Sequence, residues 1–80
     1  MNREELAKAV VAAEQDLAAA SARSARADAE WRESLAWDVT PENLEELRRR
    51  NDAMREALAQ QAAALKRRRE LLDDQLDASL

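Results

Sequence analysis

The decisive stretch of this sequence is Asp38-Val39-Thr40-Pro41-Glu42. Proline lacks a backbone N–H and clashes with the preceding helical turn, so it breaks a helix unless it stands in the first turn. Pro41 fits that first position, and the Thr40 hydroxyl can cap the helix that follows. The prediction is a helix over residues 2–37, a turn at 38–40 and a helix over 41–78, within one domain spanning 1–80.

The composition favours helices throughout. The 80 residues include no glycine and one proline, and charged residues make up 38% of the chain. This pattern is typical of long helices and coiled coils. Asn2 and Glu5 have the spacing of a capping box, which marks the start of the first helix.

Apolar residues recur on both sides of the turn at alternating spacings of three and four, the heptad pattern of a helix seam. A short connection makes the two helices antiparallel neighbours. The predicted fold is therefore all-α, an antiparallel two-helix coiled-coil hairpin. The expected seam consists of Leu6, Val10, Ala13, Leu17, Ala20, Ser24, Ala27, Trp31 and Ser34 in the first helix, and Leu44, Leu47, Asn51, Met54, Leu58, Gln61, Leu65, Arg68 and Leu72 in the second.

Folding the chain about Val39 sets the predicted register of this seam. It brings large residues against small ones, which allows close packing without voids. The polar seam residues Asn51, Gln61 and Arg68 either specify the register or the partner, or lie near water at the edge of a thin hairpin. The predicted neighbours are Leu47 and Trp31, Met54 and Ser24, Leu58 and Ala20, Leu65 and Ala13, and Leu72 and Leu6.

A two-helix seam buries little apolar surface, so we expect dimerisation or a partner protein to complete a bundle. Small residues form a second stripe on the first helix, and leucines near the C-terminus, Leu80 among them, widen the apolar arc of the second. Alanine is also the best helix former, so a solvated alanine stripe is the alternative. The expected partner-binding residues are Val11, Ala18, Ala22, Ala25, Ala29, Trp37, Ala57, Ala64, Leu71 and Leu76.

The residue types present argue against catalysis. Cysteine and histidine are absent, which leaves carboxylates as the available acid–base groups. Two carboxylate pairs, Asp73 with Asp77 and Glu42 with Glu46, stand one helical turn apart, but neither has a third ligand. We expect no catalytic residue, metal, cofactor or small-molecule substrate, and hence no enzyme.

Charge and hydropathy limit the remaining partners. The net charge is -4, and acidic residues flank the basic runs at 48–50 and 66–69, so a solvated charged surface is favoured over nucleic-acid binding. The longest mostly apolar stretch, residues 6–13, is far shorter than the roughly 20 residues needed to cross a bilayer. We expect a cytoplasmic protein that binds no membrane.

The run Pro41-Glu42-Asn43-Leu44, followed by Leu47, Ala53-Met54 and Leu58, resembles the second helix of a small co-chaperone. In type III secretion systems of bacteria, this co-chaperone and a larger helical-repeat chaperone keep the needle subunit unpolymerised. The resemblance covers some 20 residues around the turn. It implies a cytoplasmic helical hairpin that binds a chaperone and its needle-subunit cargo.

The expected function is protein–protein interaction. The leading hypothesis is an adaptor or chaperone-like hairpin that binds partner helices or dimerises, with a homodimer expected. One alternative is a small inhibitor or anti-activator, such as a phage-encoded one, that occupies a helix-binding surface of a host protein. A second alternative is an RNA-binding hairpin dimer.

Overall fold

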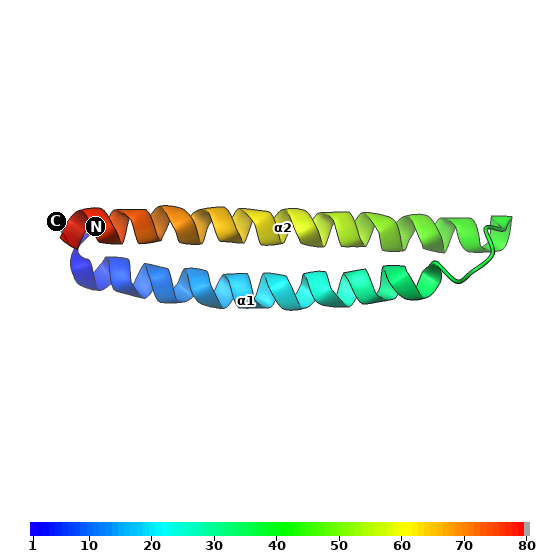
Figure 1. The fold of residues 1–80 in the computed structure, drawn as a ribbon, viewed down its shortest axis with the longest axis horizontal. Helices are drawn as coiled ribbons and strands as arrows, with labels where there is room; N and C mark the ends of the chain where they lie inside the picture. The colour runs from blue at the N-terminus through cyan, green and yellow to red at the C-terminus, as the bar shows by residue number, and fades with distance from the viewer. Residues whose placement is uncertain (80) are drawn as a thin grey trace.

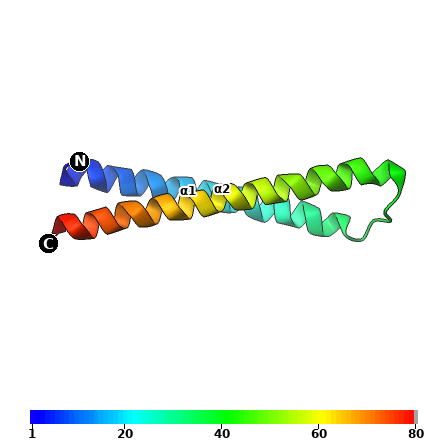
Figure 2. The ribbon, with the colours of Figure 1, turned by 90° about the horizontal axis from the view of Figure 1, so that it is seen from above.

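The computed structural model describes residues 1–79 as two long helices, α1 (Arg3–Ser34) and α2 (Pro41–Ser79). They lie side by side and run in opposite directions (Figure 1), and they cross near the middle of the molecule (Figure 2). The hairpin measures 59 × 14 × 13 Å. The predicted all-α antiparallel hairpin is confirmed. Leu80, one of the leucines expected on the outer surface, lies outside the described residues.

Helix α1 begins with the predicted cap. The backbone N–H of Glu5 donates to Asn2 Oδ1 at 2.8 Å, which satisfies one of the amides that have no partner inside the helix. Asn2 Nδ2 in turn donates to Glu5 Oε1 at 3.3 Å. In a standard capping box the backbone amide makes this second bond, so here the side-chain amide replaces it.

Helix α1 ends at Ser34, earlier than the predicted end at Trp37. The Ser34 hydroxyl donates to the Trp31 carbonyl at 2.6 Å, and the amides of Leu35, Ala36 and Trp37 donate to carbonyls three residues back. These bonds tighten the last turn and use up the carbonyls that a continuing helix needs. The connection therefore spans residues 35–40, and α2 extends past the end of α1 (Figure 1).

Helix α2 begins at Pro41, as predicted, with Thr40 as its cap. The Asn43 amide donates to Thr40 Oγ1 at 3.3 Å, and the Leu44 amide donates to the Thr40 carbonyl at 2.9 Å. Asn43 Nδ2 also donates to the Asp38 carbonyl at 2.9 Å and so ties the connection to the first turn of the helix.

We expect Thr40→Ala to lower the free energy of unfolding by about 1 kcal/mol, the usual effect of losing an N-cap side chain. Thr40→Ser retains the hydroxyl and should have a smaller effect. Urea denaturation followed by circular dichroism measures both. Equal destabilisation by the two variants would show that the hydroxyl is not the stabilising group.

The seam of α1 is confirmed, because every predicted position is buried or half-buried. The predicted seam of α2 is wrong at Leu58 and Leu65, whereas the other predicted positions of α2 are half-buried. Ala57 and Leu71 are each only 8% exposed and Ala64 is half-buried, whereas Leu58 and Leu65 are 48% and 47% exposed. The smaller residue of each pair at 57–58 and 64–65 lies closest to α1, where α1 also presents small side chains, so the two backbones approach and the leucines lie along the flank.

The register also differs from folding about Val39. Folding about Val39 would place Ser21 opposite Ala57. In the structure Gln61 Nε2 donates to Ser21 Oγ at 3.2 Å, so the partner of Ser21 lies one helical turn further along α2. The shift goes together with the extension of α2 past the end of α1, which residues 35–40 bridge. At the two ends of the hairpin some predicted neighbours still meet. Trp31 and Leu47 line one hollow, and Leu72 packs against the buried cluster of Leu6, Val10, Ala13 and Leu71.

Candidate interaction surface

A row of mostly apolar side chains runs along one flank of α2. Seven residues make nearly two helical turns, so residues at this spacing lie in line along a helix. Leu65 and Leu72 line a shallow hollow together with Arg68, and Leu44 and Asn51 line another hollow nearer the turn. The row consists of Leu44, Asn51, Leu58, Leu65 and Leu72.

Helix α1 borders the same side of the hairpin. Arg68 Nε lies 3.8 Å from Glu14 Oε1 across the two helices, which places Glu14 beside the leucine row. Val11 is three residues before Glu14 and four after Ala7, and residues at these spacings are neighbours on a helix surface. Val11 and Ala7 line a shallow hollow of their own. The two helices therefore present one shared side.

We name this side the apolar face. Val11 is 54% exposed and Leu76 is 66% exposed, so the face includes large side chains that water reaches. Apolar residues on one side of a hairpin of this size form an unusual surface for a monomer, because surface apolar residues are normally scattered. The apolar face consists of Ala7, Val11, Ala18 and Ala25 of α1 and Leu58, Ala62, Leu65, Leu72 and Leu76 of α2.

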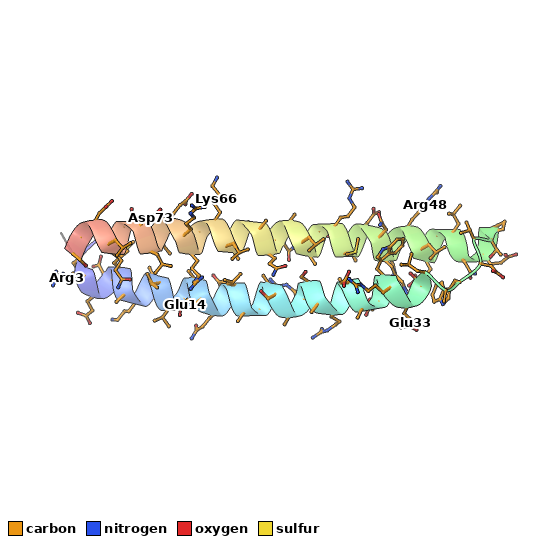
Figure 3. The ribbon with its side chains drawn as sticks, in the orientation of Figure 1. Arg3, Glu14, Glu33, Arg48, Lys66 and Asp73 are labelled. Atoms are coloured by element: carbon orange, nitrogen blue, oxygen red, sulfur yellow. The ribbon has the colours of Figure 1, made fainter. Side chains whose placement is uncertain are left out.

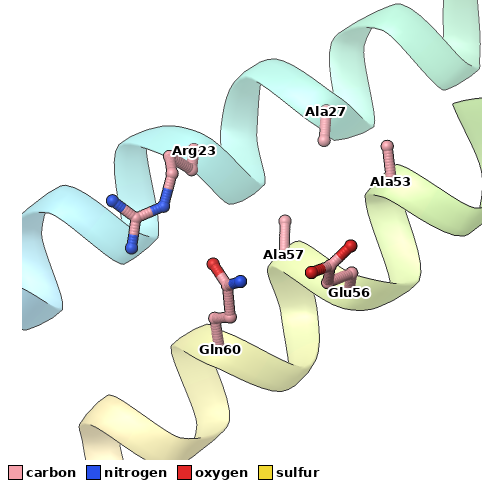
Figure 4. Close-up of a pocket in the computed structure, with 6 residues that line it drawn as sticks. All are labelled: Arg23, Ala27, Ala53, Glu56, Ala57 and Gln60. Atoms are coloured by element: carbon pink, nitrogen blue, oxygen red, sulfur yellow. The ribbon is translucent and has the colours of Figure 1, made fainter.

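The opposite flank is more polar. A shallow pocket there has alanines at its base and charged or amide side chains at its rim (Figure 4). The alanines contribute to the packing of the two helices against each other. The pocket is lined by Arg23, Ala27, Ala53, Glu56, Ala57 and Gln60.

Apart from Trp37 at the turn, the predicted partner-binding residues divide into three groups. Val11, Ala18, Ala25 and Leu76 are exposed on the apolar face, whereas the exposed alanines at 22 and 29 lie on the side of α1 that points away from α2. The expectation that Ala57, Ala64 and Leu71 lie on the outer surface is wrong, because Ala57 and Leu71 are buried and Ala64 is half-buried on the side of α2 that faces α1. Partner binding itself stays a prediction at every position.

The seam prediction missed two exposed leucines of α2. Leu58 and Leu65 were expected to face α1, yet both lie on the apolar face. The regular spacing of leucines every seven residues is visible in the sequence. It does not by itself show whether a leucine column faces the other helix or flanks the contact.

Trp37 is half-buried at the turn end of the hairpin. The guanidinium of Arg50 lies 4.5 Å from the centroid of the Trp37 ring, a cation–π contact. Arg50 also donates to the Glu30 carbonyl at 2.8 Å and to Glu46 Oε1 at 3.1 Å. Arg50 therefore joins α1, the connection and α2.

Glu46 is the carboxylate that accepts hydrogen bonds from two arginines at the turn end of the hairpin. Side-chain hydrogen bonds from Arg49, at 2.6 and 2.8 Å, and then from Arg50 lower the pKa of Glu46 to about 2. The same hydrogen bonds raise the pKa of Arg49. Two arginines of the basic run are thus paired with a carboxylate, while Arg48 projects outward from α2 (Figure 3).

The lowered pKa of Glu46 predicts an acid-sensitive turn. A carboxyl group whose pKa falls on folding stabilises the folded state above its ordinary pKa, and this contribution disappears as the pH falls toward the lowered pKa. In a Trp31→Phe variant, we expect Trp37 fluorescence to change as the pH falls from about 4.5 to about 2. Adding Glu46→Gln should remove this component of the titration. An unchanged acid titration in that double variant would contradict the assignment to Glu46.

The second basic run contributes one side chain to the space between the helices. Arg68 is half-buried beside Glu14, and its Nε is buried without a hydrogen-bond partner. Lys66 projects outward from α2 (Figure 3). Within residues 1–79, no group of three or more carboxylates is placed to hold a metal ion.

The described part of the chain contains no helix long and apolar enough to span a membrane.

The fold and this surface together define a class of protein, an antiparallel two-helix coiled-coil hairpin with an apolar face along one flank. The chain was compared with protein-family models, curated proteins and solved structures, and none of them matches it.

Proposed function

We propose that this chain is a non-enzymatic protein-interaction module that binds partner helices through the apolar face. One observation carries the proposal. Leu58 and Leu65 are about half exposed in one row with Leu72, beside the exposed Val11 of α1. A row of leucines at heptad spacing is the pattern by which one helix packs against another.

The shape of the hairpin supports the proposal. A folded monomer of 9.0 kDa exposes about 4,900 Å² by the usual scaling with mass. This hairpin exposes 6099 Å². The excess is about 1,200 Å², compared with the roughly 800 Å² that each partner buries in a standard protein–protein interface.

Site-specific photo-crosslinking in the native host tests the proposal. A photoreactive amino acid in place of Leu65 should yield a discrete protein adduct after illumination, identified by mass spectrometry. The same amino acid in place of Ala59, which is exposed on the side of α2 that points away from α1, is the control. Because both substitutions lie on the surface of one helix, they should perturb the fold equally little.

Adducts from position 65 and none from position 59 would support the apolar face as the binding surface. A lack of protein adducts from both positions 65 and 58 would contradict the proposed function. Equal labelling from positions 59 and 65 would also contradict it, because contact would then be independent of the apolar face.

A finer proposal follows from the resemblance to the type III secretion co-chaperone. It makes the partner a helical-repeat chaperone carrying a needle subunit, and it places the hairpin in the cytoplasm. Of the residues that carry the resemblance, Leu44, Leu47 and Met54 are half-buried and Leu58 is about half exposed on the apolar face. A photo-adduct that contains such a chaperone would support this version, and one that contains only unrelated proteins would overturn it.

A further inference from the structure

The two halves of the apolar face differ in side-chain size and in charge. The α1 half is built of small residues, and the acidic side chains of Glu14 and Asp28 interrupt it. The α2 half is built mostly of leucines, and the exposed side chains of Arg55 and Arg69 interrupt it. Small side chains of α1 therefore lie beside large side chains of α2, and acidic side chains lie beside basic ones, within the apolar face.

A second copy related by a two-fold axis parallel to the long axis of the hairpin would pack small side chains against large ones and acidic side chains against basic ones. Such an axis places α1 of one protomer against α2 of the other, with every neighbouring pair of helices antiparallel. The rotation does not change the position of any residue along the long axis, which we call the level of the residue. The levels are known from the hairpin itself, where Ser21 meets Gln61 and Glu14 meets Arg68.

We propose that the apolar face binds a second copy of this chain in this arrangement, forming a four-helix bundle with both turns at the same end. This inference rests on the proposed function and names its partner. At the levels fixed by the hairpin, heptad packing gives the following pairs across the interface: Ala7 with the partner's Leu76, Val11 with the partner's Leu72, Glu14 with the partner's Arg69, Ala18 with the partner's Leu65, Ser21 with the partner's Ala62, Ala25 with the partner's Leu58, and Asp28 with the partner's Arg55.

Side-chain size is complementary in these pairs. Each of the three leucines in the row from 58 to 72 meets alanine or valine, so the helices can approach without overlap or voids. The two-fold axis repeats every contact, and both copies bury the same surface.

Charge is complementary as well. Among the described residues, neither Arg55 nor Arg69 forms an ion pair within its own chain. Glu14 reaches Arg68 only at 3.8 Å, and Asp28 pairs with the exposed Arg32. In the dimer each acidic residue gains an arginine from the partner. Oppositely charged groups at matching positions fix orientation and register.

The other two-fold arrangement is disfavoured by the same charges. Packing α2 against α2 of the partner brings Arg55 and Arg69 of both copies onto one side of the bundle. It also brings Glu14 and Asp28 of both copies onto the other side. Like charges across a helix interface are destabilising, so charge favours α1 against the partner's α2.

Disulfide trapping tests the arrangement, and the absence of cysteine from the chain makes single-cysteine variants unambiguous. Purified Ala18→Cys and Leu65→Cys chains are mixed in denaturant, refolded together and oxidised. We expect the mixed disulfide to form about tenfold faster than in a matched mixture of Ala18→Cys with Ala59→Cys, because the first pair is held in contact. The product should have twice the 9.0 kDa mass of the chain.

Two results would overturn the inference. Faster formation of the Leu65→Cys homodisulfide would show α2 packed against α2. Sedimentation equilibrium that shows only monomer at all concentrations would exclude self-association. The proposed function survives the second result if photo-crosslinking from position 65, and not from position 59, still captures a different protein, and it fails if neither position 65 nor position 58 captures one.

Discussion

Replacing Leu65 with glutamate should leave the chain helical but weaken the proposed self-association by about a hundredfold or more. Leu65 is 47% exposed in the hairpin, so the fold tolerates a polar side chain there. In the proposed bundle this position meets Ala18 of the other copy and loses its water. A carboxylate without a partner is strongly unfavourable in such a place. Sedimentation equilibrium gives the dissociation constant, and circular dichroism checks the helix content.

The matched control is Ala59→Glu. Ala59 is exposed and points away from α1, and the change adds the same charge to the same helix. We expect its dissociation constant to stay within about twofold of that of the unchanged chain, because surface substitutions outside an interface have small effects. If Ala59→Glu weakens association as much as Leu65→Glu does, net charge is the cause and the apolar face is not the interface.

Truncating Leu71 should cause the largest loss of folding stability of any single alanine substitution in α2. Leu71 is 8% exposed and packs with Leu6, Val10 and Ala13 in the buried cluster near the chain ends. Leu71→Ala leaves a cavity there, and the free energy of unfolding should fall by about 2 to 4 kcal/mol. Urea denaturation measures this at one fixed protein concentration, since association would otherwise change the apparent stability.

Leu76→Ala is the comparison for Leu71→Ala. Leu76 is 66% exposed in the hairpin and lies one turn beyond the buried cluster, so its truncation should cost about 0.5 kcal/mol or less in the monomer. A Leu71→Ala variant as stable as Leu76→Ala would mean that Leu71 faces solvent. The register of α2 would then follow the pattern first inferred from the sequence.

Much of the fold could be predicted from local chemistry. Pro41 can stand only in the first turn of a helix, and Thr40 supplies the cap, so the second helix begins where the sequence predicts. The early end of α1 could not be predicted from helix-breaking residues. It depends on the Ser34 hydroxyl donating to the Trp31 carbonyl, and serine can also make other bonds within a helix.

The register of α2 could not be predicted, because α2 offers two apolar columns side by side. Ala57 and Leu58 both fit a heptad position, and so do Ala64 and Leu65. The choice depends on α1, whose small side chains favour the alanines at the closest contact. The sequence therefore predicted that apolar surface would remain uncovered, and it predicted several of the α1 positions, but it exchanged buried and exposed residues on α2.

The polar bonds between the helices have a mechanical consequence. Sliding α2 along α1 by one heptad would separate Gln61 from Ser21 and Arg68 from Glu14, and it would lose the hydrogen bond and the charge pairing between these side chains. The hairpin therefore resists shear between its arms, and a force applied to one end would be transmitted along a rod of fixed length.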